Sequence, residues 1–316
     1  MAIDAYVGPA AGIATSLLWT LTVVLFTAAS KRIGPTLVNA SRLVLAVILH
    51  AATFRVLTGQ WVPSASATQV LYLAVSGVVG LCIGDQALLT AFVDIGPRLT
   101  SVIMASAPLF AVLFGWAILG EVLVGVAWVG VVLVVGGVAW VVLERPPVAG
   151  PAHRPRPLHG VVLAFVYSAC QAGGLLLSKQ GIGHGWLPES EHLTPQAATL
   201  IRMVFAGVGM TPIVVARQLR HRADSAVGRL ATEAGSARAG MFFAAGGAIV
   251  GPYLGVWMSL VASDRAPLGI AQTLCSLVPI FILPLAATVY KEHISPRAML
   301  GAFLAVGGSA LLFLGA

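Results

Sequence analysis

Three charged side chains lie within long apolar stretches of the sequence: Arg42, Asp85 and Arg202. Charges inside a bilayer are costly and usually face a cavity or a partner, so each is a candidate functional group. Asp85 could bind an ammonium group or take up and release a proton. Arg202 could hold a carboxylate or phosphate through two parallel hydrogen bonds, or pair with Asp264 and helix-end carbonyls.

Arg42 and Asp85 are expected to meet. Arg42 lies about seven residues into its apolar stretch, and Asp85 about seven residues from the end of the next one. At about 1.5 Å per residue, both lie about 10 Å below the same surface. The expected pair is either a structural link between two helices or a part of gating or proton coupling.

A wider set of residues could line a binding cavity. Pro108 and Pro279 each remove a backbone donor within an apolar stretch, and the carbonyl freed in this way is tolerated only against protein or a wet cavity. We therefore predict that both prolines line the cavity. His50 is expected to be a packing residue rather than a proton relay. Further candidate hydrogen-bonding and aromatic groups are Gln86, Trp19, Trp257, Gln171, Gln272 and Ser276.

The composition indicates a membrane protein. Of the 316 residues, 58% are hydrophobic and 9% are charged, and the mean hydropathy is +0.95. Soluble domains carry roughly 25% charged residues, so this chain has too little polar surface for a water-soluble globule. At roughly 20 apolar residues per span, its length allows about ten spanning helices.

Apolar runs bounded by charge, proline or polar turns predict an all-α polytopic fold with ten transmembrane helices. Thr194 before Pro195 and Ser295 before Pro296 are typical of an N-cap followed by a proline at the first helical position. The predicted spans are 8–29, 35–57, 69–92, 98–119, 122–143, 159–178, 195–217, 240–262, 267–289 and 296–314.

The basic residues are unevenly distributed. Ten spans place most of the 18 Lys and Arg residues in loops on one face, whereas the acidic residues outside the spans divide evenly. This bias follows the positive-inside rule and predicts cytoplasmic basic loops, with both termini outside a plasma (inner) membrane. The arginine-rich segment at 217–238 could instead bind anionic lipid or nucleic acid. Because it lacks aromatic residues, we expect no nucleic acid as a partner.

Motifs of other functional classes are not found in the sequence. There is no Walker A sequence, no Gly-x-Ser-x-Gly elbow and no His-Glu-x-x-His motif. Cys82, Cys170 and Cys275 lie in predicted spans without CxxC spacing, so we expect buried thiols. A single intramembrane aspartate cannot form an aspartyl dyad. The sequence therefore predicts no enzyme activity, no metal and no cofactor.

The sequence also contains an internal repeat. Residues 77–144 align without a gap on residues 248–315, at a shift of 171, and the first span of each half matches at a shift of 148. Between them, Arg42 corresponds to Arg202 at a shift of 160. The predicted domains are two five-helix units at 1–147 and 158–316, joined by a Pro/Arg-rich linker at 148–157.

An odd number of spans per unit requires the second unit to be inverted relative to the first. Inverted repeats are the architecture of many secondary transporters, because two copies that face opposite sides favour two alternative shapes of similar energy. The other interpretation is that duplication merely builds a larger bundle. The symmetry is incomplete at Asp85, whose equivalent is Val256.

Two segments share a pattern ahead of the glycine-rich last span of each unit: ASAPLFAVLFGWAILGE at 105–121 and CSLVPIFILPLAATVYKE at 275–292. With Lys31, Arg42 and their equivalents, these segments resemble the EamA domains of the drug/metabolite transporter superfamily over nearly the whole chain. The resemblance implies a ten-helix permease, often an exporter of amino acids or other small metabolites, with a central cavity built from both halves. The second unit departs from the usual Gly-Glu pair at Lys291, where the first unit has Gly120.

We therefore expect a secondary-active permease that moves a small metabolite, an amino acid or drug-like compound, by alternating access. Export is the expected direction, and protons are the candidate coupling ion. The expected partners are a small-molecule substrate and membrane lipids, with the chain acting as a monomer or homodimer. A membrane-embedded enzyme or scaffold without transport activity is the alternative.

Overall fold

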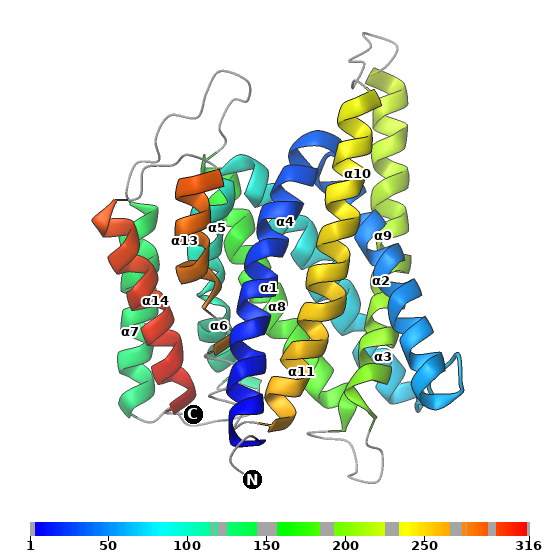
Figure 1. The fold of residues 1–316 in the computed structure, drawn as a ribbon, viewed down its shortest axis with the longest axis horizontal. Helices are drawn as coiled ribbons and strands as arrows, with labels where there is room; N and C mark the ends of the chain where they lie inside the picture. Colours follow the sequence, from blue (N-terminus) through cyan, green and yellow to red (C-terminus); the bar gives the residue numbers. More distant parts are fainter. Residues whose placement is uncertain are drawn as a thin grey trace.

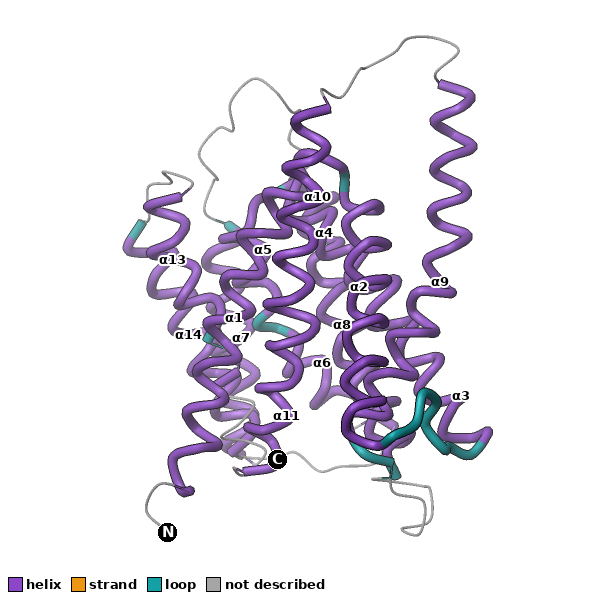
Figure 2. Tube along the Cα trace, turned by 45° about the vertical axis from the view of Figure 1, so that its right-hand side comes forward, coloured by secondary structure: helices purple, strands orange, loops and turns teal. Residues whose placement is uncertain are grey.

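The computed structural model describes residues 4–114, 117–118, 125–143, 157–183, 193–224, 234–265, 274–275, 277–289 and 295–314. Within these ranges the regular elements are all helices and no strand occurs (Figure 2). The prediction of an all-α polytopic fold is confirmed for this part of the chain.

The first half of the chain contains α1 (Asp4–Ile33), α2 (Pro35–Thr58), α3 (Ala67–Ser76), the π-helix η1 (Gly77–Gly84), α4 (Asp85–Asp94), α5 (Gly96–Met104), α6 (Ala107–Phe114) and α7 (Gly125–Val142). The turn between α1 and α2 requires a φ of 83° at Gly34, which suits glycine, and Pro35 then starts α2. Ser66 begins α3 through a reciprocal capping box with Gln69.

The second half contains α8 (Pro157–Ile182), α9 (Pro195–Asp224), α10 (Ala234–Ala248), the π-helix η4 (Ile249–Gly255), α11 (Val256–Arg265), α13 (Val278–Val289) and α14 (Pro296–Leu314). Thr194 Oγ1 accepts a hydrogen bond from the amide of Ala197 at 3.3 Å, and Ser295 Oγ accepts one from the amide of Ala298 at 3.0 Å. Both predicted N-caps are confirmed.

The two halves run in opposite directions through the bundle. In Figure 1, α1 runs from the lower end to the upper end, whereas α8, its equivalent in the second half, runs downward. The first helix of each half packs against the third predicted span of the other half. Thus α1 contacts α10, η4 and α11, and α8 contacts α3, η1 and α4. This reciprocal packing is what an inverted repeat requires.

Equivalent helices also pair directly, α2 with α9 and α7 with α14. The second pair packs through glycines, which let two backbones approach closely. A Cβ atom at Gly137 would lie 2.7 Å from the carbonyl oxygen of Gly301, and one at Gly308 would lie 2.8 Å from that of Gly130. The close approach of α7 and α14 therefore depends on these glycines.

Six described helices are long and apolar enough to cross a membrane: Val7–Ile33, Pro35–Thr58, Ala67–Asp94, Pro157–Ile182, Pro195–Leu219 and Ser236–Ser259. Three shorter apolar helices, Trp128–Val141, Val278–Val289 and Pro296–Leu311, lie within predicted spans. The structure thus confirms a multi-pass membrane protein, while the number ten stays a prediction.

The fourth predicted span is interrupted next to Pro108 and consists of two helices, α5 and α6. The chain breaks at Ala105 and Ser106, and Pro108 lies in the first turn of α6, where a proline is tolerated. Serine hydroxyls satisfy the carbonyls at the break: Ile103 accepts from Ser106 and Ser168 at 2.7 and 3.2 Å, and Ala105 from Ser309 at 3.2 Å. Pro279 is likewise the second residue of α13.

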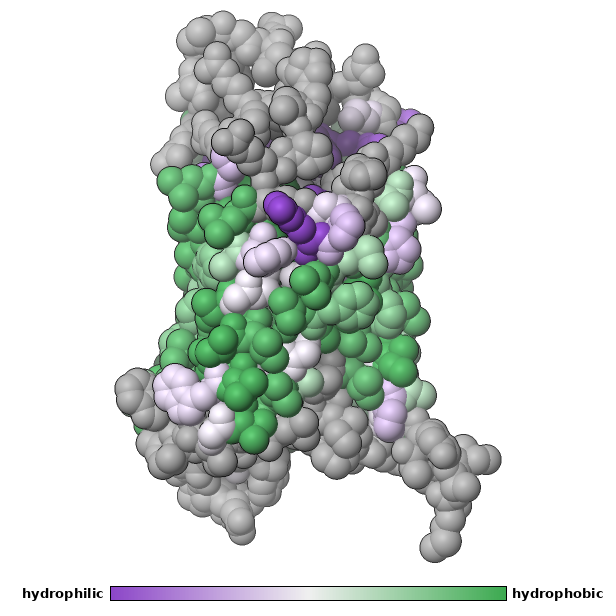
Figure 3. All heavy atoms as spheres, turned by 90° about the vertical axis from the view of Figure 1, so that its left-hand side faces the viewer, coloured by the Kyte–Doolittle hydropathy of each residue, from purple (hydrophilic) through white to green (hydrophobic). Residues whose placement is uncertain are grey.

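The surface carries a broad apolar band. Figure 3 shows hydrophobic side chains across the middle of one face and more hydrophilic ones above them. Large apolar residues on α7 and α14 are exposed in the isolated chain, among them Val132 at 67% and Phe303 at 53%. Such an extensive apolar surface would be a liability in water, and it fits contact with lipid acyl chains.

Candidate functional site

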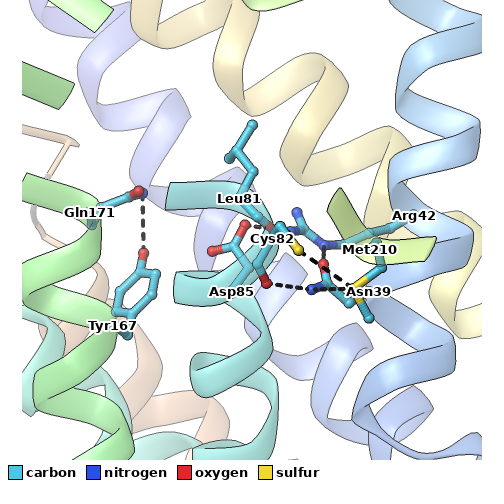
Figure 4. A network of polar contacts seen from close by, with 8 residues as sticks. All are labelled: Asn39, Arg42, Leu81, Cys82, Asp85, Tyr167, Gln171 and Met210. Carbon is cyan, nitrogen blue, oxygen red and sulfur yellow. Dashed lines mark hydrogen bonds and ion pairs between the residues drawn. The ribbon is translucent and has the colours of Figure 1, made fainter. Parts of the chain in front are cut away.

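The predicted pair of Arg42 and Asp85 is present. Arg42 on α2 donates from Nη2 to Asp85 Oδ2, and Asp85 is the first residue of α4, directly after η1 (Figure 4). Both residues are buried, with 3% and 7% of their surface exposed. A buried ion pair is retained only when further hydrogen bonds satisfy the remaining polar atoms.

The π-helix η1 supplies part of those hydrogen bonds. The amide of Asp85 bonds to the carbonyls of Gly80 and Cys82, so the Leu81 carbonyl is free to accept from Arg42 Nη2 at 3.0 Å. Single π-helical turns inside α-helices are frequent at functional sites. The irregular backbone of η1 therefore helps to bind the guanidinium of Arg42.

Asn39 completes the network and was not among the sequence candidates. Its Oδ1 accepts from Arg42 Nε at 2.9 Å, and its Nδ2 donates to the Cys82 carbonyl at 3.1 Å. Met210 Sδ on α9 lies 3.6 Å from the same Nδ2. The available signal was a polar residue three positions before Arg42, on the same helix face.

The second π-helix, η4, has a different polar partner. His50 Nε2 lies 3.1 Å from the Pro252 carbonyl, and Gln196 Nε2 lies 3.3 Å from His50 Nδ1. Because a carbonyl only accepts, Nε2 carries the proton and Nδ1 accepts from the glutamine amide. The structure therefore places His50 as a satisfied link between α2, α9 and η4, in line with its expected packing role.

Arg202 contrasts with Arg42. Among the described residues it forms no ion pair or hydrogen bond, and its Nε atom is fully enclosed. Its backbone carbonyl packs against Gly77, and a Cβ atom at Gly80 would lie 3.6 Å from its Nη2. The side chain of Asp264, the partner considered from the sequence, lies outside the described part of the chain.

The structure brings the three intramembrane charges to the same π-helix. Arg42 pairs with Asp85 at the end of η1, and Arg202 Nη2 lies 3.6 Å from the position of a Cβ atom at Gly80 within η1. The contacts of Arg202 with Gly77 and Gly80 of η1 direct its side chain toward the first half of the chain.

Two aromatic residues lie at equivalent positions against the two π-helices. Trp19 Nε1 lies 3.3 Å from the position of a Cβ atom at Gly255, and Tyr167 Cδ2 lies 3.9 Å from that at Gly84. Gln171 Nε2 donates to the Tyr167 hydroxyl at 3.3 Å (Figure 4). These side chains lie where the first helix of one half meets the π-helix of the other.

The remaining sequence candidates are more scattered. Trp257 stacks edge-on against Tyr253 at 6.0 Å between ring centroids. Gln86 donates to Thr36 Oγ1 at 3.2 Å, while its buried Oε1 has no partner among the described residues. Gln272 and Ser276 lie outside the described part of the chain, so their role stays a prediction.

A pocket of about 320 Å³ lies next to the break between α5 and α6, and it is apolar. Its lining includes Ser106 and Leu109 on the first half and Phe165 on α8, but not the three charged residues or Pro108. The cavity-lining role of the two prolines therefore stays a prediction. Within the described ranges, no group of three His, Cys, Asp or Glu side chains could hold a metal ion.

Comparisons with known proteins agree with this architecture. A solved structure, described only as the crystal structure of a protein, matches with a TM-score of 0.59 and 17% identity, over 97% of this chain and 96% of the other. At this identity the likeness concerns the fold alone. Among curated proteins, no significant match is found. The EamA-like transporter family matches twice, at residues 7–143 and 158–314, and the chain therefore belongs to this family.

Proposed function

We propose that this chain is a secondary-active permease, built from two inverted five-helix units, that moves a small metabolite across the plasma (inner) membrane by alternating access. The observation that carries the proposal is the reciprocal packing of α1 and α8 against the π-helices of the opposite half. A movement of one unit against the other would tighten one of these contacts and loosen the other, as alternating access requires. The domain boundaries at 147 and 158 belong to this proposal, supported by the two family matches.

Orientation follows from charge. Lys31 and Arg32 at the end of α1 lie at the same end of the bundle as the end of α9 (Figure 1). The positive-inside rule assigns this end to the cytoplasm, which leaves both termini outside. We propose export as the working direction and lipids as the surrounding partners, with either a monomer or a homodimer as the working unit.

Asp85 is the proposed coupling group. Its carboxylate is held by Arg42 and lies directly after the irregular η1, so protonation removes the ion pair and frees the guanidinium. Breaking this pair would allow α2 and η1 to separate. Protons entering from the outside would thus be linked to the change of shape that releases substrate.

Counterflow tests transport itself. The purified chain is reconstituted into liposomes loaded with one unlabelled compound from a panel of amino acids, organic acids, amines and drug-like molecules, and uptake of the labelled compound is followed. We expect saturable, exchangeable uptake for at least one compound. Lipid turnover without any counterflow would support the alternative of a membrane-embedded enzyme.

Asp85→Asn tests the coupling. Because the amide cannot exchange a proton, we expect the variant to lose accumulation driven by a pH gradient and to retain exchange in the absence of a gradient. Asp94→Asn is the matched control, since Asp94 pairs with His159 at the end of α4, with 2.6 Å between Oδ2 and Nδ1. An Asp85→Asn variant with the pH dependence of the wild type would exclude proton coupling through this residue.

A further inference from the structure

The apolar pocket beside the break between α5 and α6 lies apart from the charged residues. Its volume of about 320 Å³ is enclosed by side chains of three helices, among them Leu109 on α6, Val138 on α7 and Phe165 on α8. The main packing partners of α7 are α14 and α5, so a gap is left between α7 and α8. Ligand pockets in proteins typically have volumes of about 300–1,000 Å³, so this gap is large enough for a ligand.

The walls of the pocket select for a hydrocarbon. Ser106 is the only polar side chain among the described lining residues, and its hydroxyl already donates to the Ile103 carbonyl at 2.7 Å. A polar ligand group would lose its hydrogen bonds to water there without finding new ones. An empty gap, in turn, forfeits the dispersion contacts of the side chains that surround it. An alkyl chain would restore these contacts and leave no polar group unsatisfied.

The pocket opens toward the lipid-facing surface. Val135 on α7 and Leu143 directly after α7 both line it, and they are 50% and 82% exposed in the isolated chain. Figure 1 shows α7 and α14 together at one edge of the bundle, and both helices carry exposed apolar side chains that fit contact with lipid. The pocket is therefore continuous with this surface, and a hydrocarbon could enter it from the bilayer without crossing water.

The length of the pocket matches one leaflet. Val135 and Leu143 are eight positions apart, which corresponds to about 12 Å along a helix at about 1.5 Å per residue. A hydrocarbon core about 30 Å thick gives each leaflet about 15 Å. Leu143 lies at the end of a predicted span, whereas Leu109 and Phe165 lie deeper, next to the helix break. The pocket thus runs from one membrane surface toward the midplane, as a single acyl chain does.

We propose that this pocket binds one acyl chain of a membrane phospholipid. The chain enters beside Leu143 and ends against Leu109 and Phe165, so it fills the gap between α7 and α8 and supports the helix break. The α7–α14 pair is thereby held against the rest of the bundle by lipid as well as by protein. This inference goes beyond the proposed transport function, and only its assignment to the cytoplasmic leaflet rests on the proposed orientation.

Photo-crosslinking tests the site without requiring transport. The full chain is reconstituted into phosphatidylcholine vesicles that contain a trace of a photoreactive phosphatidylcholine. One probe carries a diazirine at the end of an acyl chain, and a second carries it next to the ester. After irradiation, peptide mass spectrometry locates the adducts. We expect the chain-end probe to modify Leu109 and Phe165 and the ester-side probe to modify Leu143. Phe303 on α14, which is 53% exposed, reports contact with bulk lipid in the same sample.

A variant that fills the entrance locates the effect. Ala139 lines the pocket and is exposed, so the ring in Ala139→Phe enters the opening without crowding the core. Because the ring takes the space of several chain atoms, adducts at Leu109 and Phe165 should fall at least about fivefold relative to Phe303. Val132→Phe is the matched control. It adds the same ring to α7 at an exposed position outside the described lining, and its adducts should equal those of the wild type.

The outcomes are distinct. Adducts at Phe303 with none at Leu109 or Phe165 would mean that lipid only surrounds the bundle, and this result would overturn the site. Undiminished adducts in Ala139→Phe, or a reversed depth order of the two probes, would overturn it too. Loss of the pocket adducts on addition of a transported compound would assign the pocket to the substrate instead. Pocket adducts without counterflow of any compound would support the lipid site and refute the proposed transport, whereas counterflow without pocket adducts would do the reverse.

Discussion

The two halves of this chain place an arginine at equivalent positions, Arg42 and Arg202, and give them different surroundings. Arg42 has an aspartate, an asparagine and a π-helix carbonyl as partners. Arg202 has none among the described residues. Both side chains lie against η1, although symmetry would direct Arg202 to η4. The repeat has therefore kept the residue type and changed its surroundings, from a bound guanidinium at Arg42 to one without a partner among the described residues at Arg202.

The π-helices show the same divergence. Leu81 in η1 and Pro252 in η4 are equivalent at the shift of 171, and each carbonyl accepts a hydrogen bond from α2. Arg42 serves the first and His50 the second. Helix α2 thus binds a backbone carbonyl of the π-helix in each half. A shift of α2 along its axis would break both hydrogen bonds.

The largest expected effect is that of Arg42→Gln. Glutamine cannot pair with Asp85, and an unpaired buried carboxylate costs about 3–5 kcal/mol of unfolding free energy. Thermal and denaturant unfolding in the same detergent would measure the loss. Arg55→Gln provides the exposed control. A loss below about 1 kcal/mol would show that the pair contributes little and would remove the contrast with Arg202.

The next largest effect is expected for Gly77→Ala. A methyl group there would overlap the backbone carbonyl of Arg202, which cannot move aside as a flexible side chain could. Such overpacking lowers the unfolding free energy by about 1–3 kcal/mol. Gly207→Ala is the matched control on α9, since nothing lies within 4 Å of its Cβ position. Equal stability of the two variants would contradict the close approach of α9 and η1.

His50→Phe should have a smaller effect. It leaves the Pro252 carbonyl and the Gln196 amide without their partner, at a cost of about 1–2 kcal/mol. The same unfolding assay measures it, and Gln196→Ala, which removes one weaker bond, should cost less. If His50→Phe leaves the unfolding free energy unchanged, η4 does not need the hydrogen bond from His50. The two π-helices would then differ in how they are stabilised, although they lie at equivalent positions.

The sequence predicted the scaffold better than the site. Apolar runs, N-caps and the repeat identified helices and their opposite directions, because hydrophobic length and duplication are visible in one dimension. The π-helices were missed, since their backbone bonds depend on packing between glycines such as Gly80 and the helix opposite. The pairing of Arg42 with Asp85 followed from depth alone, whereas Asn39 and the direction of Arg202 depend on side-chain orientation across helices.

The smallest effect on stability is expected for Arg202→Gln, and it is the most informative one. Because Arg202 has no partner among the described residues, its removal should break no ion pair, and the unfolding free energy should change by less than about 1 kcal/mol or rise. Measured in the same unfolding assay as Arg42→Gln, this variant allows the changes in unfolding free energy at the two equivalent positions to be compared directly. A loss as large as that of Arg42→Gln would mean that Arg202 is a structural residue with a partner of its own. A stable variant would mean that selection has kept this arginine for something other than the fold.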